Sequence, residues 1–214
     1  MKNRAFNDSL FIFQISFALL FGFFQIKQML FVSVEGLSIS TYLFTTLFVG
    51  VNTFFSFQAN KVLTNRIAIQ NLIIYILGTL IYLLFSLILI LKSTWSFNDS
   101  QTLFFVVTAS IIVILKNKKN GLKITDPVLK SDLGIIFRAI PHCFMAYKIF
   151  VEGGGGLSVF MVIIFHILTL TRIILIYSSY LKLKTDINRK SILRTEIWNE
   201  VSWIIVTLAW LIKT

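Results

Sequence analysis

The chain has 214 residues, of which 57% are hydrophobic and only 14% are charged, and 22 of them are Phe. Water-soluble globular proteins carry about 25% charged residues, so this composition excludes a soluble domain, and with it a soluble nucleic-acid-binding fold, despite a formal net charge of +11. Cys143 is the only cysteine, which excludes an intramolecular disulfide and a cysteine-built metal site.

The apolar residues gather in seven runs separated by short polar segments. A bilayer core of about 30 Å requires roughly 20 apolar residues in a helix. The charged N-terminus resembles that of a signal peptide, but the first run continues past Phe24 without a small-residue cleavage site, so we interpret it as a membrane helix. The fourth run is the shortest, and we expect a connecting helix there. The predicted spans are Leu10–Leu30, Ile39–Phe57, Ile67–Leu91, Leu103–Leu115, Leu133–Phe150, Leu157–Tyr180 and Ile197–Ile212.

The basic residues fall mostly on one side of these spans. Because basic loops stay in the cytoplasm, their distribution predicts a cytoplasmic N-terminus and a C-terminus outside. Arg138 and Arg172 fall within spans, and Lys27, Lys92, Lys148 and Lys213 lie on the outer side. The cytoplasmic side carries Lys2, Arg4, Lys61, Arg66, Lys116, Lys118, Lys119, Lys123, Lys130, Lys182, Lys184, Arg189, Lys190 and Arg194.

The two halves of the sequence share an ordered series of matched segments. Such a series predicts two parallel three-helix repeats joined by a linker helix, a 3+1+3 arrangement of seven transmembrane helices. We expect the first repeat over residues 1–92, the linker helix and basic loop over 93–130, and the second repeat over 131–214. The matches are Phe24-Gln25 with Pro141-His142, VEGLS (34–38) with VEGGGGLS (151–158), and RIAIQN (66–71) with RTEIWN (194–199).

These segments resemble the motifs of the PQ-loop superfamily, which includes the SWEET sugar transporters and their bacterial half-size relatives. The family pattern has Pro-Gln near the end of the first helix of a unit, Gly-Leu-Ser before the second and an Asn in the third. Phe24 and His142 replace one member of each Pro-Gln pair, and Phe54 and Ile174 stand where sugar carriers often have Trp. The residues that fit the pattern are Gln25, Gly36, Leu37, Ser38, Gly50, Phe54, Phe57 and Asn71, then Pro141, Leu157, Ser158, Tyr177 and Asn199.

The resemblance implies a set of solute-binding residues, with Asn71 and Asn199 first among them. A buried amide offers donors and acceptors to a polar solute, and the repeat predicts that these two lie at equivalent places lining one cavity. Phe54 and Tyr177 are implied as further contacts. The alternative interpretation of the two amides is that they form hydrogen bonds between helices.

The resemblance also implies a hinge or gate at the matched Pro-Gln positions. Pro141 removes a backbone hydrogen bond from its helix, which favours bending there. Gln25 and His142 belong to the same matched pairs. A tolerated kink near a helix end is the alternative interpretation of Pro141.

Ionisable residues within spans are candidates for function because their burial is costly. Arg138 and His142 are four residues apart and share a helical face, as do Glu196 and Glu200, so ion pairs between their helices are expected. His166 is the candidate for binding a coupling proton, with Glu200 next and Arg138 as a charged neighbour. The alternative is structural salt bridging near the membrane surface, of which Glu196 and Arg194 are the expected examples.

The sequence contains no arrangement of residues typical of an enzyme, a cofactor site or a metal site. It favours a passive or proton-coupled carrier that moves a small polar solute, most readily a sugar, across the bilayer by alternating access between the repeats. A homo-oligomer is compatible with this hypothesis. The alternatives are a carrier of an amino acid or of a vitamin similar to nicotinamide riboside, and a non-transporting receptor of the SWEET fold in which Arg138 and Arg172 clamp a carboxylate.

Overall fold

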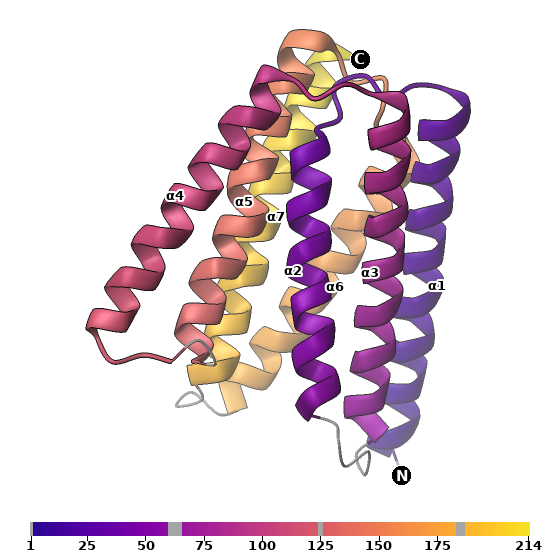
Figure 1. Cartoon of the computed structure of the whole chain (residues 1–214). Helices are drawn as coiled ribbons and strands as arrows, with labels where there is room; N and C mark the ends of the chain where they lie inside the picture. The colour runs from indigo at the N-terminus through magenta and orange to yellow at the C-terminus, as the bar shows by residue number, and fades with distance from the viewer. Residues whose placement is uncertain (1, 60–65, 124–125, 183–186) are drawn as a thin grey trace.

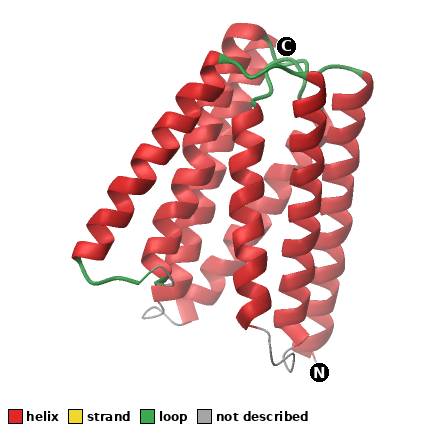
Figure 2. Cartoon of the chain, in the orientation of Figure 1, coloured by secondary structure: helices red, strands yellow, loops and turns green. Residues whose placement is uncertain are grey.

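The computed structural model describes residues 2–59, 66–123, 126–182 and 187–214. These residues form α-helices and no β-strand (Figure 2), which confirms the predicted all-helical class. Lys61 and Lys184, two residues on which the predicted orientation rests, lie outside the described residues. The helices are α1 (Lys2–Phe31), α2 (Ile39–Ala59), α3 (Arg66–Lys92), α4 (Phe97–Lys119), α5 (Pro127–Glu152), α6 (Val159–Lys182) and α7 (Ile187–Lys213).

Six of these helices, α1 to α6, are long and apolar enough to cross a membrane. The chain therefore has the character of an α-helical integral membrane protein, with six such helices where seven were predicted. In α7, the polar residues Glu196, Asn199 and Glu200 lower the mean hydropathy. The expectation of a short fourth span is wrong, because the polar residues before Leu103 form the first turns of a helix of 23 residues.

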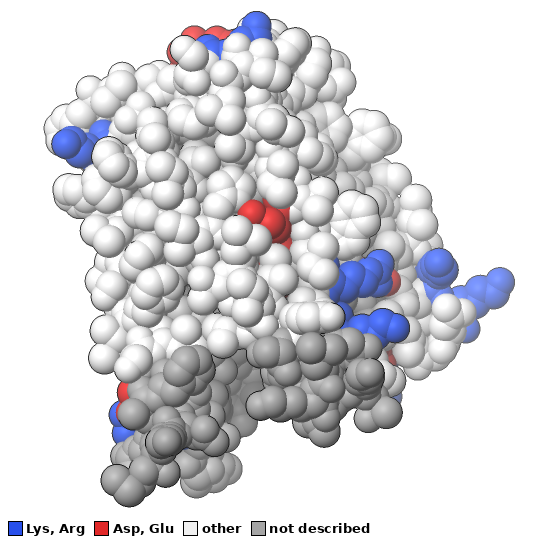
Figure 3. Space-filling model, turned by 180° about the vertical axis from the view of Figure 1, so that it is seen from behind, with Lys and Arg blue, Asp and Glu red and all other residues white. Residues whose placement is uncertain are grey.

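Large apolar side chains cover much of the outer surface of the bundle. Leu91 is 84% exposed and Phe97 is 78% exposed. The face in Figure 3 consists mostly of uncharged atoms, with Lys and Arg at its margins and one acidic patch near its centre. A surface this apolar is unfavourable in water and suits contact with lipid.

The helices run alternately in opposite directions, so the two termini lie at opposite ends of the bundle (Figure 1). Helix α3 packs against both α1 and α2, and α7 packs against both α5 and α6. Between these two sets, α1 contacts α6 and α2 contacts α5. Helix α4 contacts α2 and α5 and diverges from the bundle toward its C-terminal end.

Small and hydroxyl-bearing residues allow neighbouring helices to approach closely. Between α2 and α3, the hydroxyls of Thr53 and Thr79 are 2.8 Å apart, and each also donates to a carbonyl of its own helix. Between α5 and α7, Thr195 Oγ1 donates to Ser131 Oγ at 2.9 Å. A Cβ at Gly134 of α5 would lie 3.0 Å from Thr195 Cγ2. Such contacts are typical of helix packing in membranes, where apolar burial alone gives little attraction between helices.

A buried aromatic core joins the first three helices to the last three. Phe165 of α6 lies between Trp203 of α7 and Phe21 of α1, with ring centroids 4.4 Å and 6.0 Å apart respectively. Phe85 of α3 packs on Phe21 at 5.6 Å. Because these rings come from four helices, their packing fixes how α1 and α3 lie against α6 and α7.

The two matched loops cross at the end of the bundle that contains the C-terminus. The Gly156 backbone N–H donates to the Glu35 carbonyl oxygen at 3.0 Å. Gly36 has a φ of 75°, and a Cβ there would overlap the carbonyl oxygen of Gly153. Glycine is required at Gly36 both by its left-handed backbone and by this close approach.

We expect Gly36→Ala to lower the apparent melting temperature of the detergent-purified protein more than Gly121→Ala does. Both glycines are left-handed, with φ of 75° and 73°, where a Cβ costs about 1–2 kcal/mol. Only at Gly36 would the methyl group also collide with backbone, since nothing lies within 4 Å of a Cβ at Gly121. Equal decreases in melting temperature would contradict the close contact between the loops.

Candidate functional site

Buried charged residues from α5, α6 and α7 meet within the bundle. Glu196 Oε1 lies 3.4 Å from Arg138 Nη1 and 3.3 Å from Arg172 Nη2. The Glu196 side chain is 6% exposed, that of Arg138 14% and that of Arg172 35%. Glu196 lies nine residues after the start of α7, which places it about 14 Å along the helix. One carboxylate oxygen is therefore shared by two guanidinium groups well inside the bundle.

The arginine side chains also reach the first three helices. Arg172 Nη2 donates to the Tyr75 hydroxyl of α3 at 3.2 Å. The Arg138 guanidinium lies 5.3 Å from the ring centroid of Phe48 on α2. The charged cluster therefore sits where the first three and the last three helices face each other, and Arg172 bridges them.

A histidine and a second glutamate form a close pair in the same region. His166 Nδ1 of α6 lies 2.6 Å from Glu200 Oε1 of α7, and His166 Nε2 lies 2.8 Å from the Thr207 hydroxyl. The His166 side chain is 21% exposed and that of Glu200 is 7% exposed. The two residues singled out from the sequence for proton binding are thus in direct contact.

Several buried polar atoms beside these charges have no hydrogen-bond partner within the described residues. Asn199 is 1% exposed, and both its Nδ2 and its Oδ1 are unpartnered. Glu200 Oε2 and Arg138 Nε are unpartnered as well. Leaving such a group buried without a partner costs about 1–3 kcal/mol, so their clustering needs an explanation. A polar solute that enters this region would satisfy them.

The other predicted solute contacts lie elsewhere. Asn71 is exposed, Phe54 is 56% exposed and Tyr177 is 51% exposed. The expectation that Asn71 and Asn199 share one environment is therefore wrong. Helix α3 packs on α1 and α2, and this packing decides which of its residues are buried. Gln70 faces α1, where its Nε2 donates to Asp8 Oδ1 at 2.9 Å. The next residue, Asn71, is left on the outside.

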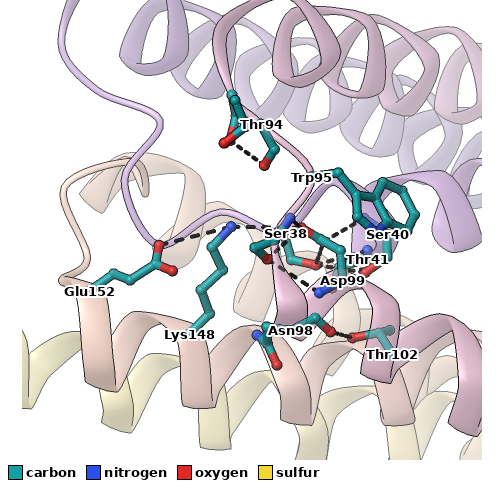
Figure 4. A network of polar contacts seen from close by, with 12 residues as sticks. Ser38, Ser40, Thr41, Thr94, Trp95, Asn98, Asp99, Thr102, Lys148 and Glu152 are labelled. Atoms are coloured by element: carbon teal, nitrogen blue, oxygen red, sulfur yellow. Dashed lines mark hydrogen bonds and ion pairs between the residues drawn. The ribbon is translucent and has the colours of Figure 1, made fainter.

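A second buried cluster, drawn in Figure 4, lies where α2 begins, at the end of the bundle that contains the C-terminus. Asp99 of α4 is 0% exposed. Its Oδ1 accepts hydrogen bonds from Ser38 Oγ at 2.7 Å, and from the backbone N–H and Oγ of Ser40, both at 2.9 Å. Its Oδ2 accepts from the Ser96 N–H at 3.0 Å and from Ser96 Oγ at 2.7 Å. One carboxylate therefore caps its own helix and the start of α2.

Lys148 of α5 completes this second cluster. Its Nζ lies 3.9 Å from Asp99 Oδ2 and 3.9 Å from Glu152 Oε2, and its side chain is 5% exposed. Sequence reasoning missed Asp99 and counted Lys148 only as an outer-side cation. The Ser96-x-x-Asp99 spacing is that of a capping box and could have located Asp99. The cluster joins α4 to both α2 and α5.

The start of α6 is capped from α1 in a comparable way. Gln25 is fully buried; its Nε2 donates to the Gly156 carbonyl at 2.8 Å, and its Oε1 accepts from the Ser158 N–H at 3.1 Å. Gln28 Nε2 donates to the Gly155 carbonyl at 2.6 Å. Gln25 thus connects the first helix to the sixth across the crossing loops.

Pro141 and His142 are both buried within α5. The Pro141 carbonyl accepts a hydrogen bond from Thr41 Oγ1 of α2 at 2.9 Å. His142 Nδ1 lies 2.9 Å from Ser202 Oγ, and its ring centroid is 5.0 Å from that of Trp203. His142 therefore faces Ser202 and Trp203 of α7, and a hinge at Pro141 remains a prediction.

Of the two residues named as examples of structural salt bridging near the surface, Arg194 forms such a bridge, with Asp132 at 2.8 Å on the exterior. For Glu196 the expectation is wrong, because residues two apart on a helix point in different directions. Glu196 pairs with Arg138, as the shared helical faces predicted. It is a member of the buried cluster and not a surface residue.

We expect Asp99→Ala to destabilise the protein strongly, because it leaves the donors of Ser38, Ser40 and Ser96 buried without an acceptor. Removing one partner of a buried charged network costs about 3–5 kcal/mol. Asp99→Asn should retain part of this stability, since its single carbonyl oxygen can still accept from α2. Asp132→Ala, which removes the exterior pair with Arg194, is the control at about 0–1 kcal/mol. A melting temperature of Asp99→Ala equal to that of Asp132→Ala would contradict the role of this network.

No protein-family model matches the chain, and no curated protein and no solved structure shows significant similarity to it. What the protein does is therefore inferred from the sequence motifs and from the geometry of the two polar clusters.

Proposed function

We propose that this membrane protein is a carrier of a small polar solute that works by alternating access between two three-helix repeats. The observation that carries the proposal is Asn199, a buried amide with two unpartnered atoms, beside ionised side chains where two sets of helices meet. Such a site provides hydrogen bonds for a solute only when the surrounding helices separate. Separation of two helix sets is the motion that alternating access requires.

The helix contacts support the 3+1+3 organisation. If α1, α2 and α3 correspond to α5, α6 and α7, the contacts of α3 with α1 and α2 correspond to those of α7 with α5 and α6. The same correspondence converts the contact of α1 with α6 into that of α5 with α2. This pattern is the one expected of two parallel repeats around an axis along the membrane normal, with α4 as the linker.

The solute class is a separate part of the proposal. The resemblance to SWEET-type proteins favours a sugar, whereas the two arginines favour a solute with an acidic group, such as an amino acid or an acidic vitamin. A non-transporting receptor of the same fold would also use these arginines to clamp a carboxylate. Uptake by proteoliposomes separates the two carriers from the receptor, because a receptor binds solute without moving it.

We propose the orientation with the N-terminus in the cytoplasm on the basis of the basic residues at that end. A reporter that is active only in the cytoplasm should be active when fused before Met1 and silent when fused after Thr214. The reverse result would mean that the protein has the opposite orientation.

We expect Asn199→Ala to reduce solute binding without lowering the melting temperature. Because neither amide atom has a protein partner within the described chain, truncation breaks no hydrogen bond of the fold. Loss of a hydrogen bond to solute costs about 1–3 kcal/mol, or a roughly five- to hundredfold loss of affinity. The measurement is uptake of a labelled sugar, amino acid and vitamin panel, normalised to folded protein.

Asn117→Ala on α4 is the matched control. Asn117 is also buried, but its Nδ2 donates to the Val113 carbonyl at 2.9 Å, and it lies on the linker helix. This variant should lose stability and retain uptake. An Asn199→Ala protein that melts earlier but takes up solute normally would assign Asn199 a structural role and remove the main support for the site.

A further inference from the structure

We propose that the buried cluster binds one monovalent carboxylate solute together with one proton, as an electroneutral pair. The proposal rests on the proposed carrier function and specifies its solute class and its coupling. It follows from the number and placement of the charged groups around Asn199. The cluster consists of Arg138 on α5, His166 and Arg172 on α6, and Glu196 and Glu200 on α7.

The charges of the cluster balance when no solute is present. Arg138 and Arg172 contribute two positive charges, and Glu196 and Glu200 contribute two negative charges. One added proton leaves a net charge of one positive unit inside a membrane protein, which is costly unless an anion accompanies it. A monovalent carboxylate restores neutrality, a dianion overshoots it, and a neutral solute leaves the added charge unbalanced.

The pair of His166 and Glu200 can take up this proton without losing a hydrogen bond. With a neutral imidazole, Nδ1–H donates to Glu200 Oε1 at 2.6 Å, and Nε2 accepts from the Thr207 hydroxyl at 2.8 Å. When the pair gains a proton, Nε2–H donates to the same hydroxyl, because a threonine hydroxyl both donates and accepts. The proton belongs to the pair as a unit, as expected for two groups this close.

The arginine side of the cluster can accept the carboxylate. Both guanidinium groups approach the same oxygen of Glu196 at 3.3 and 3.4 Å, longer than the about 2.7–2.9 Å of a strong charged hydrogen bond. Arg138 Nε has no hydrogen-bond partner among the residues that the structure describes, and the Arg172 side chain is 35% exposed. Two arginines that share one acid thus retain donors for a second, and planar guanidinium groups match carboxylates well.

Other titratable groups lie around this pair. Among the described residues, His166 is the histidine that contacts a carboxylate, whereas His142 Nδ1 lies 2.9 Å from Ser202 Oγ, whose hydroxyl donates to the backbone carbonyl oxygen of Asn199 at 2.8 Å. Helix α1 contacts α6 through uncharged side chains, among them Phe21 and Phe24. Among the described residues, Tyr75 and Tyr82 on α3 also face the cluster.

The test is uptake by proteoliposomes containing the full chain, at zero membrane potential and with the outside one pH unit more acidic. The probes are three carboxylates, gluconate, lactate and nicotinate, each with a neutral partner, glucose, lactamide or nicotinamide. Protein-free liposomes provide the background from direct diffusion. We expect at least one carboxylate to accumulate about tenfold, because one proton per anion converts one pH unit into a tenfold ratio. Its neutral partner should not accumulate.

Two variants separate the parts of the proposal. Arg172→Gln should reduce carboxylate uptake more than tenfold, whereas Arg66→Gln, which changes an exposed arginine paired with Asp8, should leave it unchanged. His166→Gln should abolish accumulation driven by the pH gradient. Carboxylate accumulation that persists in His166→Gln would overturn the proton site.

The outcomes also distinguish this inference from the carrier function. Uptake of a neutral partner that is independent of pH and of Arg172, with no carboxylate accumulation, would overturn the inference while supporting a carrier. Uptake of none of the six probes above the background of protein-free liposomes would count against both the inference and the carrier function.

Discussion

The crossing of the two glycine-containing loops is the contact on which the rest of the structure depends. The hydrogen bond from the Gly156 N–H to the Glu35 carbonyl, and the two bonds between Gln25 and the segment before α6, hold α1 and α6 together at one end. Backbone approaches this closely only because Gly36 and Gly156 lack side chains. Toward the other end, the helix sets meet through side chains, such as Arg172 on Tyr75 and Lys130 over the ring of Phe55. The loops therefore act as a fixed connection about which the polar interior is arranged.

That interior contains two polar clusters with different chemistry. The cluster around Asp99 is saturated, because five hydrogen bonds reach one carboxylate, and it rigidly joins the linker helix to α2 and α5. The cluster around Glu196 is not saturated, because within the described part of the chain Asn199, Arg138 and Glu200 keep unpartnered atoms. In a bilayer core, where water is absent, every unpartnered group is costly. Stability and function are thereby divided between the two clusters, with the first as a structural joint and the second as the proposed binding site.

The sequence predicts the features that depend on local pattern, and it does not predict those that depend on helix rotation. Apolar runs locate the helices, and the i to i+4 spacing of Glu196 and Glu200 correctly predicts that α7 presents acids to the cations of α5 and α6. Which acid meets which cation is decided by how α7 rotates against its neighbours, so Glu196, expected in a salt bridge near the surface, pairs with Arg138 inside the bundle. Asn71 was expected inside by analogy with Asn199, but the packing of α3 leaves it exposed. The reach of Asp99 to α2 depends on a contact between residues about 60 apart, which no local pattern encodes.

The proposed alternating access requires that the two helix sets separate around the Glu196 cluster while the helices within each set stay together. The most direct test is the distance between spin labels at Ile76 on α3 and Ile174 on α6, both exposed, after replacement of the exposed Cys143 by Ser. Alternating access predicts that this distance distribution shifts when a transported solute or acid is added. Labels at Ile174 and Ile197, within the last three helices, should keep one distance throughout. A single unchanged distance between Ile76 and Ile174 under all of these conditions would contradict alternating access between the two helix sets.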